Sequence, residues 1–318
     1  MKPVSVSVLI VTRNRAGALA QSALPPLARQ TSPPLEVLVW DASDGERSRE
    51  AVSAFAAAHP GLALRYRRAP RAGSSSQRND AVAELRGDVV LFLDDDAELA
   101  DDGLEALSEA FADPEVAGAG LSIRLTPAAR ALHAGRSRAE LLFRRLFLLP
   151  APAARPSCLA SGWNRYTLEP YAGAAEWLCS CCAAFRHGLF ADHRFDESLQ
   201  RFGGYAYAED VLFSQRLFRE GRRLVLAPRG SVYHDQAGGG RLDTAGAYAA
   251  RIYNHFVLWR EATFPFLPWS FIAYAWSATG FGAFLLLTGL LKADGARLKG
   301  LALGAGAVLD DLLRGKGL

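Results

Sequence analysis

The sequence of 318 residues is 50% hydrophobic and carries a formal net charge of +3 at pH 7. Its length accommodates one α/β domain of about 200–250 residues together with an appendage. The basic residues form no long run, so we expect no nucleic-acid partner.

Short apolar runs alternate with helical segments over residues 4–93. Strands are predicted at 4–12, 35–40, 62–67 and 88–93, and helices at about 16–30, 47–58 and 74–86. This alternation is typical of a βαβ sheet. The first strand runs directly into Arg13 and Arg15, which argues against a signal peptide. Right-handed connections place the C-terminal ends of parallel strands at one edge, where open sheets bind ligands.

Polar motifs follow three of these strands at the edge where a ligand would bind. They are Thr12, Arg13 and Asn14 after the first strand, Asp41 and Ser43 after the second, and Asp94, Asp95 and Asp96 after the fourth. Three separate positions in the sequence therefore converge on one crevice. Their convergence supports a binding site more strongly than any one motif does.

The pattern weakens over residues 130–176. The amphipathic stretch 138–150 is either an ordinary surface helix or a helix that faces a membrane or an acceptor. Beyond it, a strand is predicted at 177–186, a helix at 209–220 and a strand at 223–227. The crowded Cys179, Cys181 and Cys182 lack zinc-ribbon spacing, so we expect them in a buried strand of a reduced protein.

Residues 262–291 contain no charged side chain, and the segment 270–291 is long enough to cross a hydrocarbon core of about 30 Å. Three alternatives remain open: a membrane-inserted or re-entrant helix, an interfacial helix pair, and a buried core helix. Trp269 and Trp276 lie toward one end, as at a membrane interface. Residues 292–318 are predicted to form an amphipathic surface helix.

The adjacent carboxylates of Asp94, Asp95 and Asp96 repel one another unless water or a hard cation neutralises them. Mg²⁺ prefers one or two carboxylates together with phosphate oxygens, which a nucleotide diphosphate supplies, and Mn²⁺ is similar. A solvated acidic loop is the alternative, but the position at the ligand edge of a sheet favours the metal. His234 follows a strand and could add an imidazole ligand, although a lone histidine is more often structural.

Two helix starts offer further polar groups. Residues 71–79 place a glycine and serines before a helix whose first turn carries Arg78, which suits a phosphate or ribose, or else simply caps the helix. Glu209 and Asp210 open another helix, whose dipole should keep Asp210 ionised and able to accept a proton from a hydroxyl. The alternative for this second pair is a capping role alone.

Motifs of several other enzyme classes are missing from the sequence. It has no GxxxxGK[ST] loop, no GxGxxG after the first strand and no GxSxG elbow. A kinase-like, dinucleotide-dependent or serine-hydrolase function therefore has no support.

Together, the motifs resemble those of glycosyltransferase family 2, whose members are inverting enzymes of the GT-A fold. The matching segments are 5–15, 37–45, 72–82, 89–99, 195–221 and 232–235. The resemblance covers about residues 4–236. It implies an α/β fold with a Rossmann-like, mostly parallel sheet flanked by helices, and a C-terminal apolar helical appendage.

The resemblance implies a role for each motif residue. For the nucleotide sugar these residues are Thr12, Arg13, Asn14, Asp41, Ser43, Arg78, Asn79, Asp94 and Asp95. Asp96 and His234 would ligate Mg²⁺ or Mn²⁺. Asp210 would be the general base, and Glu209 would orient the acceptor or donor.

The implied donor is a UDP-, GDP- or dTDP-sugar, and the acceptor a glycan or polyprenyl-linked hydroxyl in polysaccharide or glycoconjugate synthesis. A C-terminal apolar segment often accompanies family members that glycosylate lipid-linked intermediates, and by this analogy the chain resembles rhamnosyltransferase-like members. We expect a GT-A domain over 1–260, with a nucleotide-binding half (1–125) and an acceptor half (126–260), followed by a membrane-associated region at 261–318. The expected location is the cytoplasmic face of the cell membrane, with the chain either peripheral or held by one inserted helix.

The sequence departs from the family pattern in two places. The segment Cys179–Cys182 replaces a glycine-rich run, and Asp41 is followed by Ala-Ser-Asp where Asn-Gly-Ser is often found. Two alternative functions remain. A sugar-1-phosphate nucleotidyltransferase is disfavoured because the first loop lacks a glycine-rich, lysine-bearing stretch. A non-catalytic nucleotide-sugar-binding module is disfavoured because Asp96 and Asp210 are both present.

Overall fold

The computed structural model describes residues 4–125, 137–203, 206–234 and 244–314. A nine-stranded sheet carries the fold of this part of the chain. Its strands are β1 (Val6–Thr12), β2 (Glu36–Asp41), β3 (Leu64–Arg68), β4 (Val89–Leu93), β5 (Ala97–Leu99), β6 (Val116–Leu125), β9 (Gly173–Ala175), β10 (Cys182–Arg186) and β11 (Arg223–His234). A separate two-stranded ladder consists of β7 (Ser157–Cys158) and β8 (Asn164–Arg165).

The strand order is β3-β2-β1-β4-β10-β6-β11-β5, with β9 also paired to β11. The first four strands of the chain pair in parallel, as their alternation with helices predicts. The predicted α/β class, with helices flanking the sheet, is confirmed. The second half of the sheet is mixed, because β10 runs antiparallel to both β4 and β6, and β5 and β9 run antiparallel to β11.

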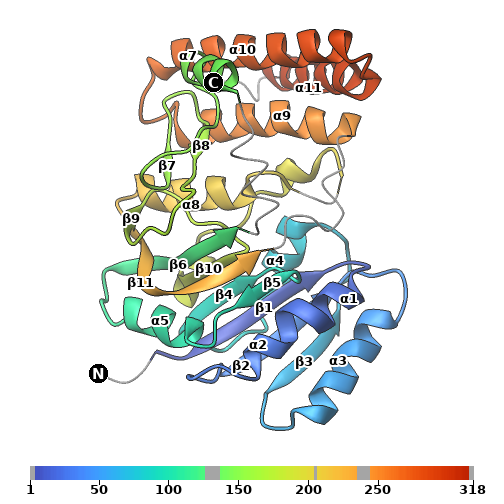
Figure 1. Ribbon diagram of the computed structural model, residues 1–318, viewed down its shortest axis with the longest axis vertical. Helices are drawn as coiled ribbons and strands as arrows, with labels where there is room; N and C mark the ends of the chain where they lie inside the picture. Colours follow the sequence, from blue (N-terminus) through green and yellow to red (C-terminus); the bar gives the residue numbers. More distant parts are fainter. Residues whose placement is uncertain (1–3, 126–136, 204–205, 235–243, 315–318) are drawn as a thin grey trace.

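Helices cover both faces of the sheet and form further layers beyond it (Figure 1). They are α1 (Ala16–Ala18), the π-helical η1 (Leu19–Ala23), α2 (Leu24–Leu27), α3 (Arg47–Ala58), α4 (Ser74–Val82), α5 (Gly103–Ala110), α7 (Arg138–Leu146), the 3-10 turns η2 (His187–Ala191) and η3 (Glu197–Gln200), α8 (Glu209–Arg219), α9 (Ala245–Ala262), α10 (Ser270–Leu291) and α11 (Gly295–Leu313). Moving away from the sheet, α8 comes first, then α9, and finally α10 and α11 with α7 beside them (Figure 1).

The two faces of the sheet carry separate apolar clusters. In β1, Val8 and Ile10 belong to the cluster on one face and Leu9 to the cluster on the other, as the two-residue period of a strand requires. All three side chains are almost fully buried. Because both faces are covered, the strand reads as a nearly continuous apolar run. The polar residues that follow this apolar run, starting with Thr12, lie at the carboxyl edge of the sheet.

Two predicted elements have different bounds in the structure. The helix predicted at 16–30 is divided into α1, η1 and α2 and ends at Leu27. Pro25 and Pro26 lack the N–H groups that would bond to carbonyls in η1, so they interrupt the regular α-helical pattern there. The strand predicted at 177–186 begins only at Cys182, and the residues before it form a loop. All four cysteines are free thiols.

The strand predicted to end at residue 227 continues to His234 as β11. A register shift between Leu226 and Ser231 carries it past Pro228 and Gly230, which read as a turn in the sequence. This extension delivers His234 to the ligand edge. Several further elements of the described ranges were not predicted from the sequence, among them α5, β6 and α9.

Helix α10 buries mostly small residues and exposes large apolar ones. Ser270, Ala273, Ser277, Gly280 and Gly289 are buried against the protein, together with one large residue, Leu285. The exposed side chains on the opposite surface are Phe271, Ile272, Trp276, Leu286, Leu287, Leu290 and Leu291. The buried-core alternative for residues 270–291 is therefore wrong. Among the helices of the described ranges, α10 is the one that is long and apolar enough to cross a membrane.

Buried His255 in α9 is expected to make folding stability depend on pH. Its Nε2 lies 2.6 Å from the carbonyl oxygen of Ser161, and its ring stacks on Trp163 with centroids 3.9 Å apart. Burial lowers the pKa of His255 to about 3, from an ordinary 6.5. Below pH 6.5 the imidazole of His255 is therefore protonated in the unfolded chain but stays neutral in the folded chain. The free energy of unfolding is therefore highest above pH 6.5 and decreases as the pH falls below it.

The expected loss is about 1.4 kcal/mol of unfolding free energy per pH unit below 6.5 from this one group. Urea unfolding at pH 7 and pH 5 measures it. The variant His255→Gln should lose most of this dependence, whereas His59→Gln, at the end of α3, should keep it. Equal pH dependence in wild type and His255→Gln would show that His255 is not the responsible group.

Candidate functional site

The structure brings the three strand-end motifs together at the carboxyl edge of the sheet. The hydroxyl of Thr12 donates a 2.6 Å hydrogen bond to Oδ2 of Asp95, and the backbone N–H of Asn14 donates to Oγ of Ser43 at 2.7 Å. Gln77 in α4 donates from Nε2 to the carbonyl oxygens of Thr12 and Trp40, at 3.1 and 3.0 Å. This buried amide ties the ends of β1 and β2 to the start of α4.

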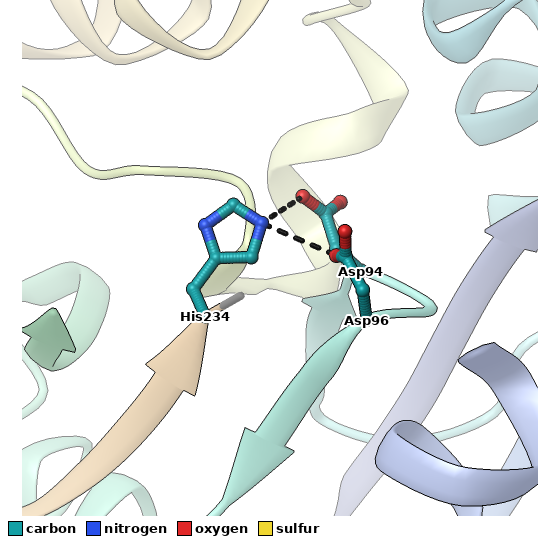
Figure 2. A group of neighbouring side chains, drawn as sticks. All are labelled: Asp94, Asp96 and His234. Atoms are coloured by element: carbon teal, nitrogen blue, oxygen red, sulfur yellow. Dashed lines mark ion pairs between the residues drawn. The ribbon is translucent and has the colours of Figure 1, made fainter. Parts of the chain in front are cut away.

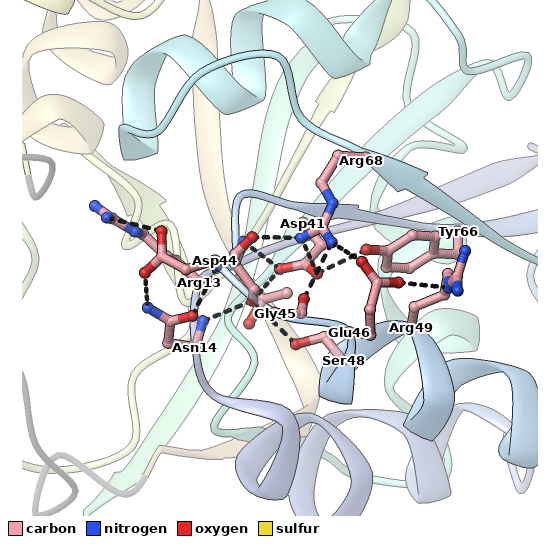
Figure 3. Close-up of polar contacts among 12 residues, drawn as sticks. Arg13, Asn14, Asp41, Asp44, Gly45, Glu46, Ser48, Arg49, Tyr66 and Arg68 are labelled. Carbon is pink, nitrogen blue, oxygen red and sulfur yellow. Dashed lines mark hydrogen bonds and ion pairs between the residues drawn. The ribbon is translucent and has the colours of Figure 1, made fainter.

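Asp41 at the end of β2 is the centre of a polar network (Figure 3). Its carboxylate accepts hydrogen bonds from the N–H and hydroxyl of Ser43 and, at 2.8 Å, from the hydroxyl of Tyr66. Arg68 lies 3.6 Å from the same carboxylate. The fully buried Asp41 is therefore rigidly held, with the predicted Ser43 beside it.

Asn14 links the first two motifs from the other side. Its Nδ2 donates to Asp44 at 2.7 Å, and its Oδ1 accepts the backbone N–H of Asp44 at 3.0 Å (Figure 3). Asn14 has a positive φ of 58°, a conformation that asparagine adopts more readily than most residues. The guanidinium of Arg13 is half exposed and lies 3.5 Å from Asp44. The loop after β1 is thus fixed to the loop after β2.

The end of β11 places a histidine against two of the three consecutive aspartates. His234 Nε2 lies 3.2 Å from Oδ1 of Asp96 and 3.7 Å from Oδ2 of Asp94 (Figure 2). One ligand atom from each of the three residues lies within 4.8 Å of the others. The structure thus brings Asp96 and His234 together, as the metal prediction requires, and adds Asp94 to them.

The two carboxylates of this group fit Mg²⁺ or Mn²⁺, and His234 adds one imidazole nitrogen beside them. Burial alone would raise the pKa of Asp96, but the hydrogen bond from His234 and the charge of Arg15 hold it at about 2. Burial opposes protonation of His234, yet its hydrogen bond to Asp96 and the charge of Asp94 raise its pKa overall. The carboxylates of Asp94 and Asp96 thus favour the protonated, positively charged form of His234.

Arg15 is a site residue to which no role was assigned from the sequence. Its guanidinium lies 2.9 Å from Asp95 and 2.7 Å from Asp96, so it bridges the two carboxylates. Burial nonetheless raises the pKa of Asp95 to about 7, against the hydrogen bond from Thr12 and the charge of Arg15. The sequence did contain a signal for this role, because Arg15 directly follows the motif after β1 and three consecutive aspartates follow β4.

Glu209 and Asp210 begin α8 and face the same edge of the sheet. The Asp210 carboxylate accepts the backbone N–H of Ser180 at 3.0 Å and that of Val211 at 2.8 Å. Burial raises the pKa of Asp210, and these two N–H groups together with Arg78 oppose the rise. The expectation that the helix dipole keeps Asp210 ionised therefore left out burial, which favours the protonated carboxyl group.

Arg78 in α4 connects the acid pair of α8 to the aspartates after β4. It forms a buried ion pair with Glu209, lies 3.3 Å from Asp94, and donates to Oγ of Ser180 at 3.2 Å. Burial raises the pKa of Glu209 to about 7 despite the attraction of Arg78. Arg78 thus spans the space between the candidate metal group and the candidate base.

Asn79 faces away from this edge of the sheet. Its Nδ2 donates to the carbonyl oxygen of Phe195 at 2.9 Å and to Glu197 at 3.1 Å, and its Oδ1 accepts the N–H of Phe195 at 2.9 Å. Two of these contacts hold Phe195, just before η3, and the third holds Glu197, the first residue of η3. The structure therefore does not bring Asn79 together with the other predicted nucleotide-sugar residues.

Known proteins share this architecture. Mannosyltransferase PcManGT from Pyrobaculum calidifontis, in complex with GDP-Man and Mn²⁺, is 19% identical with a TM-score of 0.56, over 98% of this chain and 88% of that one. TarS 1-349 from S. aureus with UDP-GlcNAc is 18% identical with a TM-score of 0.52, over 98% and 92%. GalNAc-T7 with UDP, GalNAc and Mn²⁺ is 15% identical with a TM-score of 0.59, over 79% of this chain and 47% of its own length. At these sequence identities, the similarity shows only that the chain has the same fold as these three proteins.

No curated protein sequence matches the chain. The family model described as glycosyl transferase family 2 matches residues 7–193, which is more than half of the 318 residues. The match includes the three strand-end motifs that meet at the candidate site. The chain belongs to glycosyl transferase family 2.

Proposed function

We propose that the chain transfers a sugar, with inversion, from a nucleotide-diphosphate donor to a hydroxyl of a glycan or lipid-linked acceptor. The observation that carries this proposal is the position of Asp94, Asp96 and His234 on one side of Arg78, and of Glu209 and Asp210 on the other. A site for a diphosphate thus adjoins a site for a base. Membership of the family supports the same reaction.

The proposed chemistry is a single in-line displacement at the anomeric carbon. A bond forms between the acceptor oxygen and that carbon as the bond from the carbon to the diphosphate oxygen breaks. Asp210 accepts the hydroxyl proton, and its raised pKa suits it to general-base work near neutral pH. Mg²⁺ or Mn²⁺ held by Asp96, His234 and Asp94 would supply positive charge for the departing diphosphate. The ion pair between Glu209 and Arg78 fixes the first turn of α8, which carries Asp210.

We assign the nucleotide to the loops after β1 and β2, in the nucleotide-binding half predicted at 1–125. The buried Asp41 network and the Asn14–Asp44 contacts give this region a fixed shape. The similar folds carry GDP-Man or UDP-GlcNAc, which supports a UDP-, GDP- or dTDP-sugar donor here. The transferred group is then a hexose or deoxyhexose, and the acceptor half is that predicted at 126–260.

A panel of nucleotide sugars tests the proposal. Purified protein with Mn²⁺ should release nucleoside diphosphate from at least one donor, in proportion to transferred sugar. Consumption of a nucleoside triphosphate together with a sugar 1-phosphate would instead establish a nucleotidyltransferase. Nucleotide binding without turnover of any donor would establish a non-catalytic binding module.

We further propose that the outer face of α10 lies on a membrane, at the cytoplasmic face in polysaccharide or glycoconjugate synthesis. Its outward side chains are large and apolar, and α11 packs alongside α10 in the outermost layer (Figure 1). Most of the buried residues of α10 are small, with Leu285 the exception, whereas the exposed surface carries several large apolar side chains, an arrangement that suits a lipid environment. This orientation favours the interfacial helix pair over a single spanning helix.

Charge on this face is expected to release the protein from lipid vesicles. The double variant Leu287→Glu/Leu290→Glu removes two exposed leucines, each worth about 1.5–3 kcal/mol if it is buried in lipid. Vesicle co-sedimentation should fall by at least about tenfold, whereas Leu35→Glu, an exposed leucine before β2, should bind like wild type. Unchanged binding of the double variant would contradict this orientation.

A further inference from the structure

A cavity of about 410 Å³ lies among the helices beyond the sheet, between α7, α9, α10 and α11. Its wall is strongly aromatic, with Phe143 of α7, Trp163 after β7, and Phe281 and Phe284 of α10. Trp163 is almost completely buried, so this part of the wall is fixed. Space of this size, lined by apolar rings, suits an apolar ligand group.

Three arginines line the same cavity: Arg144 of α7, Arg251 of α9 and Arg297 of α11. No Asp or Glu is among the described residues of its lining. Guanidinium groups against an apolar wall favour an anion, and the fork of N–H donors matches phosphate in particular. The cavity therefore combines recognition of an apolar group with recognition of an anion.

Two of these arginines pair with carboxylates outside the lining. Arg144 Nε donates to Glu140 at 2.9 Å and its Nη1 donates to the carbonyl oxygen of Pro150 at 3.2 Å, while Arg297 Nε lies 2.9 Å from Asp294. These pairs fix each side chain through part of its guanidinium. Arg297 Nε also lies 3.1 Å from the hydroxyl of Tyr248. A guanidinium has five N–H donors, so Arg144 and Arg297 keep donors on their Nη atoms beyond these contacts.

The cavity also lies between the proposed membrane face and the proposed base. Tyr207, three residues before Asp210, belongs to its wall, and Asn254 of α9 holds the carbonyl oxygen of Tyr207 at 2.8 Å. On the other side, α7 exposes Leu142 and Leu146 next to lining residues of the same helix. The wall of the cavity thus includes a residue just before α8, and it includes residues of α7 that are close in sequence to exposed apolar side chains.

We propose that this cavity binds the phosphate or diphosphate group of an acceptor that carries a long apolar chain. The arginines hold the anion, the aromatic wall holds the first part of the chain, and the rest of the chain continues along α7 and α10 to the lipid. The identification as an acceptor site rests on the proposed function. It names the acceptor class as a glycan linked to a lipid phosphate or lipid diphosphate, whose sugar hydroxyl is the group that reaches Asp210.

Binding of dodecyl phosphate, measured calorimetrically below its micelle concentration and without any nucleotide sugar, tests the proposal. Dodecyl maltoside has the same chain with an uncharged head, and inorganic phosphate has the same charge with no chain. We expect dodecyl phosphate to bind at least about tenfold more tightly than either, because each lacks half of the interactions. Arg144→Gln and Arg297→Gln should each weaken it about tenfold, the effect of losing a charge-assisted hydrogen bond.

Arg145→Gln is the matched control, because Arg145 follows Arg144 on α7 but is exposed and does not line the cavity. Equal effects of Arg144→Gln and Arg145→Gln, or none from either cavity variant, would overturn the proposal. Equal affinity for inorganic phosphate would mark a simple anion site and overturn it too, as would equal affinity for dodecyl maltoside. Nucleotide release from a sugar donor, measured on the same preparations, tests the proposed function separately.

Discussion

Replacing Asp210 with asparagine is expected to lower the rate of sugar transfer by about 10²–10⁴-fold with little change in donor affinity. Asparagine has nearly the same shape, and its oxygen can keep one of the two backbone N–H groups, from Ser180 or Val211, that Asp210 accepts. It cannot accept a proton from the acceptor hydroxyl. Nucleotide release at saturating donor gives kcat, and the donor dependence gives KM, so that the two effects are separated.

The same variant should also change the pH profile. A base works only when deprotonated, and burial raises the pKa of Asp210 above its ordinary value. The wild-type rate should therefore increase with pH through that raised pKa, and Asp210→Asn should lose this increase. Glu220→Gln, at the far end of α8, is the control that should behave as wild type. Retention of more than about a tenth of the wild-type rate by Asp210→Asn would assign the base to another group.

The convergence of Thr12, Asp41 and Asp95 was predictable because it follows from local patterns. Each residue comes directly after a short apolar run, and the ends of parallel strands share one edge of the sheet. The structure adds the bonds that make this convergence specific, such as the one from Thr12 to Asp95. The bounds of α3, 47–58, were also correct, since a helix bounded by loops has a clear pattern.

What the sequence left open depends on pairing between distant segments. β10 inserts antiparallel between β4 and β6, and β5 pairs antiparallel with β11, which brings the loop after β4 to His234. No local periodicity encodes such pairing. The same limit applies to Arg15, Arg78 and Asn79, whose partners lie far along the chain. Burial of Asp210 is likewise a property of the packed fold, so the sequence could not reveal the rise in its pKa.

Removing one metal ligand should make activity require much more Mn²⁺. In the group Asp94, Asp96 and His234, Asp96→Asn removes the charge of one carboxylate ligand and His234→Gln removes the imidazole nitrogen. We expect the Mn²⁺ concentration for half-maximal activity to rise by at least about 10–100-fold, since even residues that only support a ligand have effects of this size. Nucleotide release over a Mn²⁺ titration measures the shift. Calorimetric Mn²⁺ binding with nucleoside diphosphate gives a readout that is independent of turnover.

Asp95 provides the comparison that tests the ligand set itself. It is adjacent to Asp96 and also carries a carboxylate, but its oxygens are bound to Thr12 and Arg15 and it is outside the group that could hold a metal. Asp95→Asn should therefore weaken donor use while leaving the Mn²⁺ midpoint within a few fold of wild type. Exposed Asp101→Asn should change neither. If Asp95→Asn moved the midpoint as far as Asp96→Asn does, the cation would be held by the consecutive aspartates and not by the strand-end histidine.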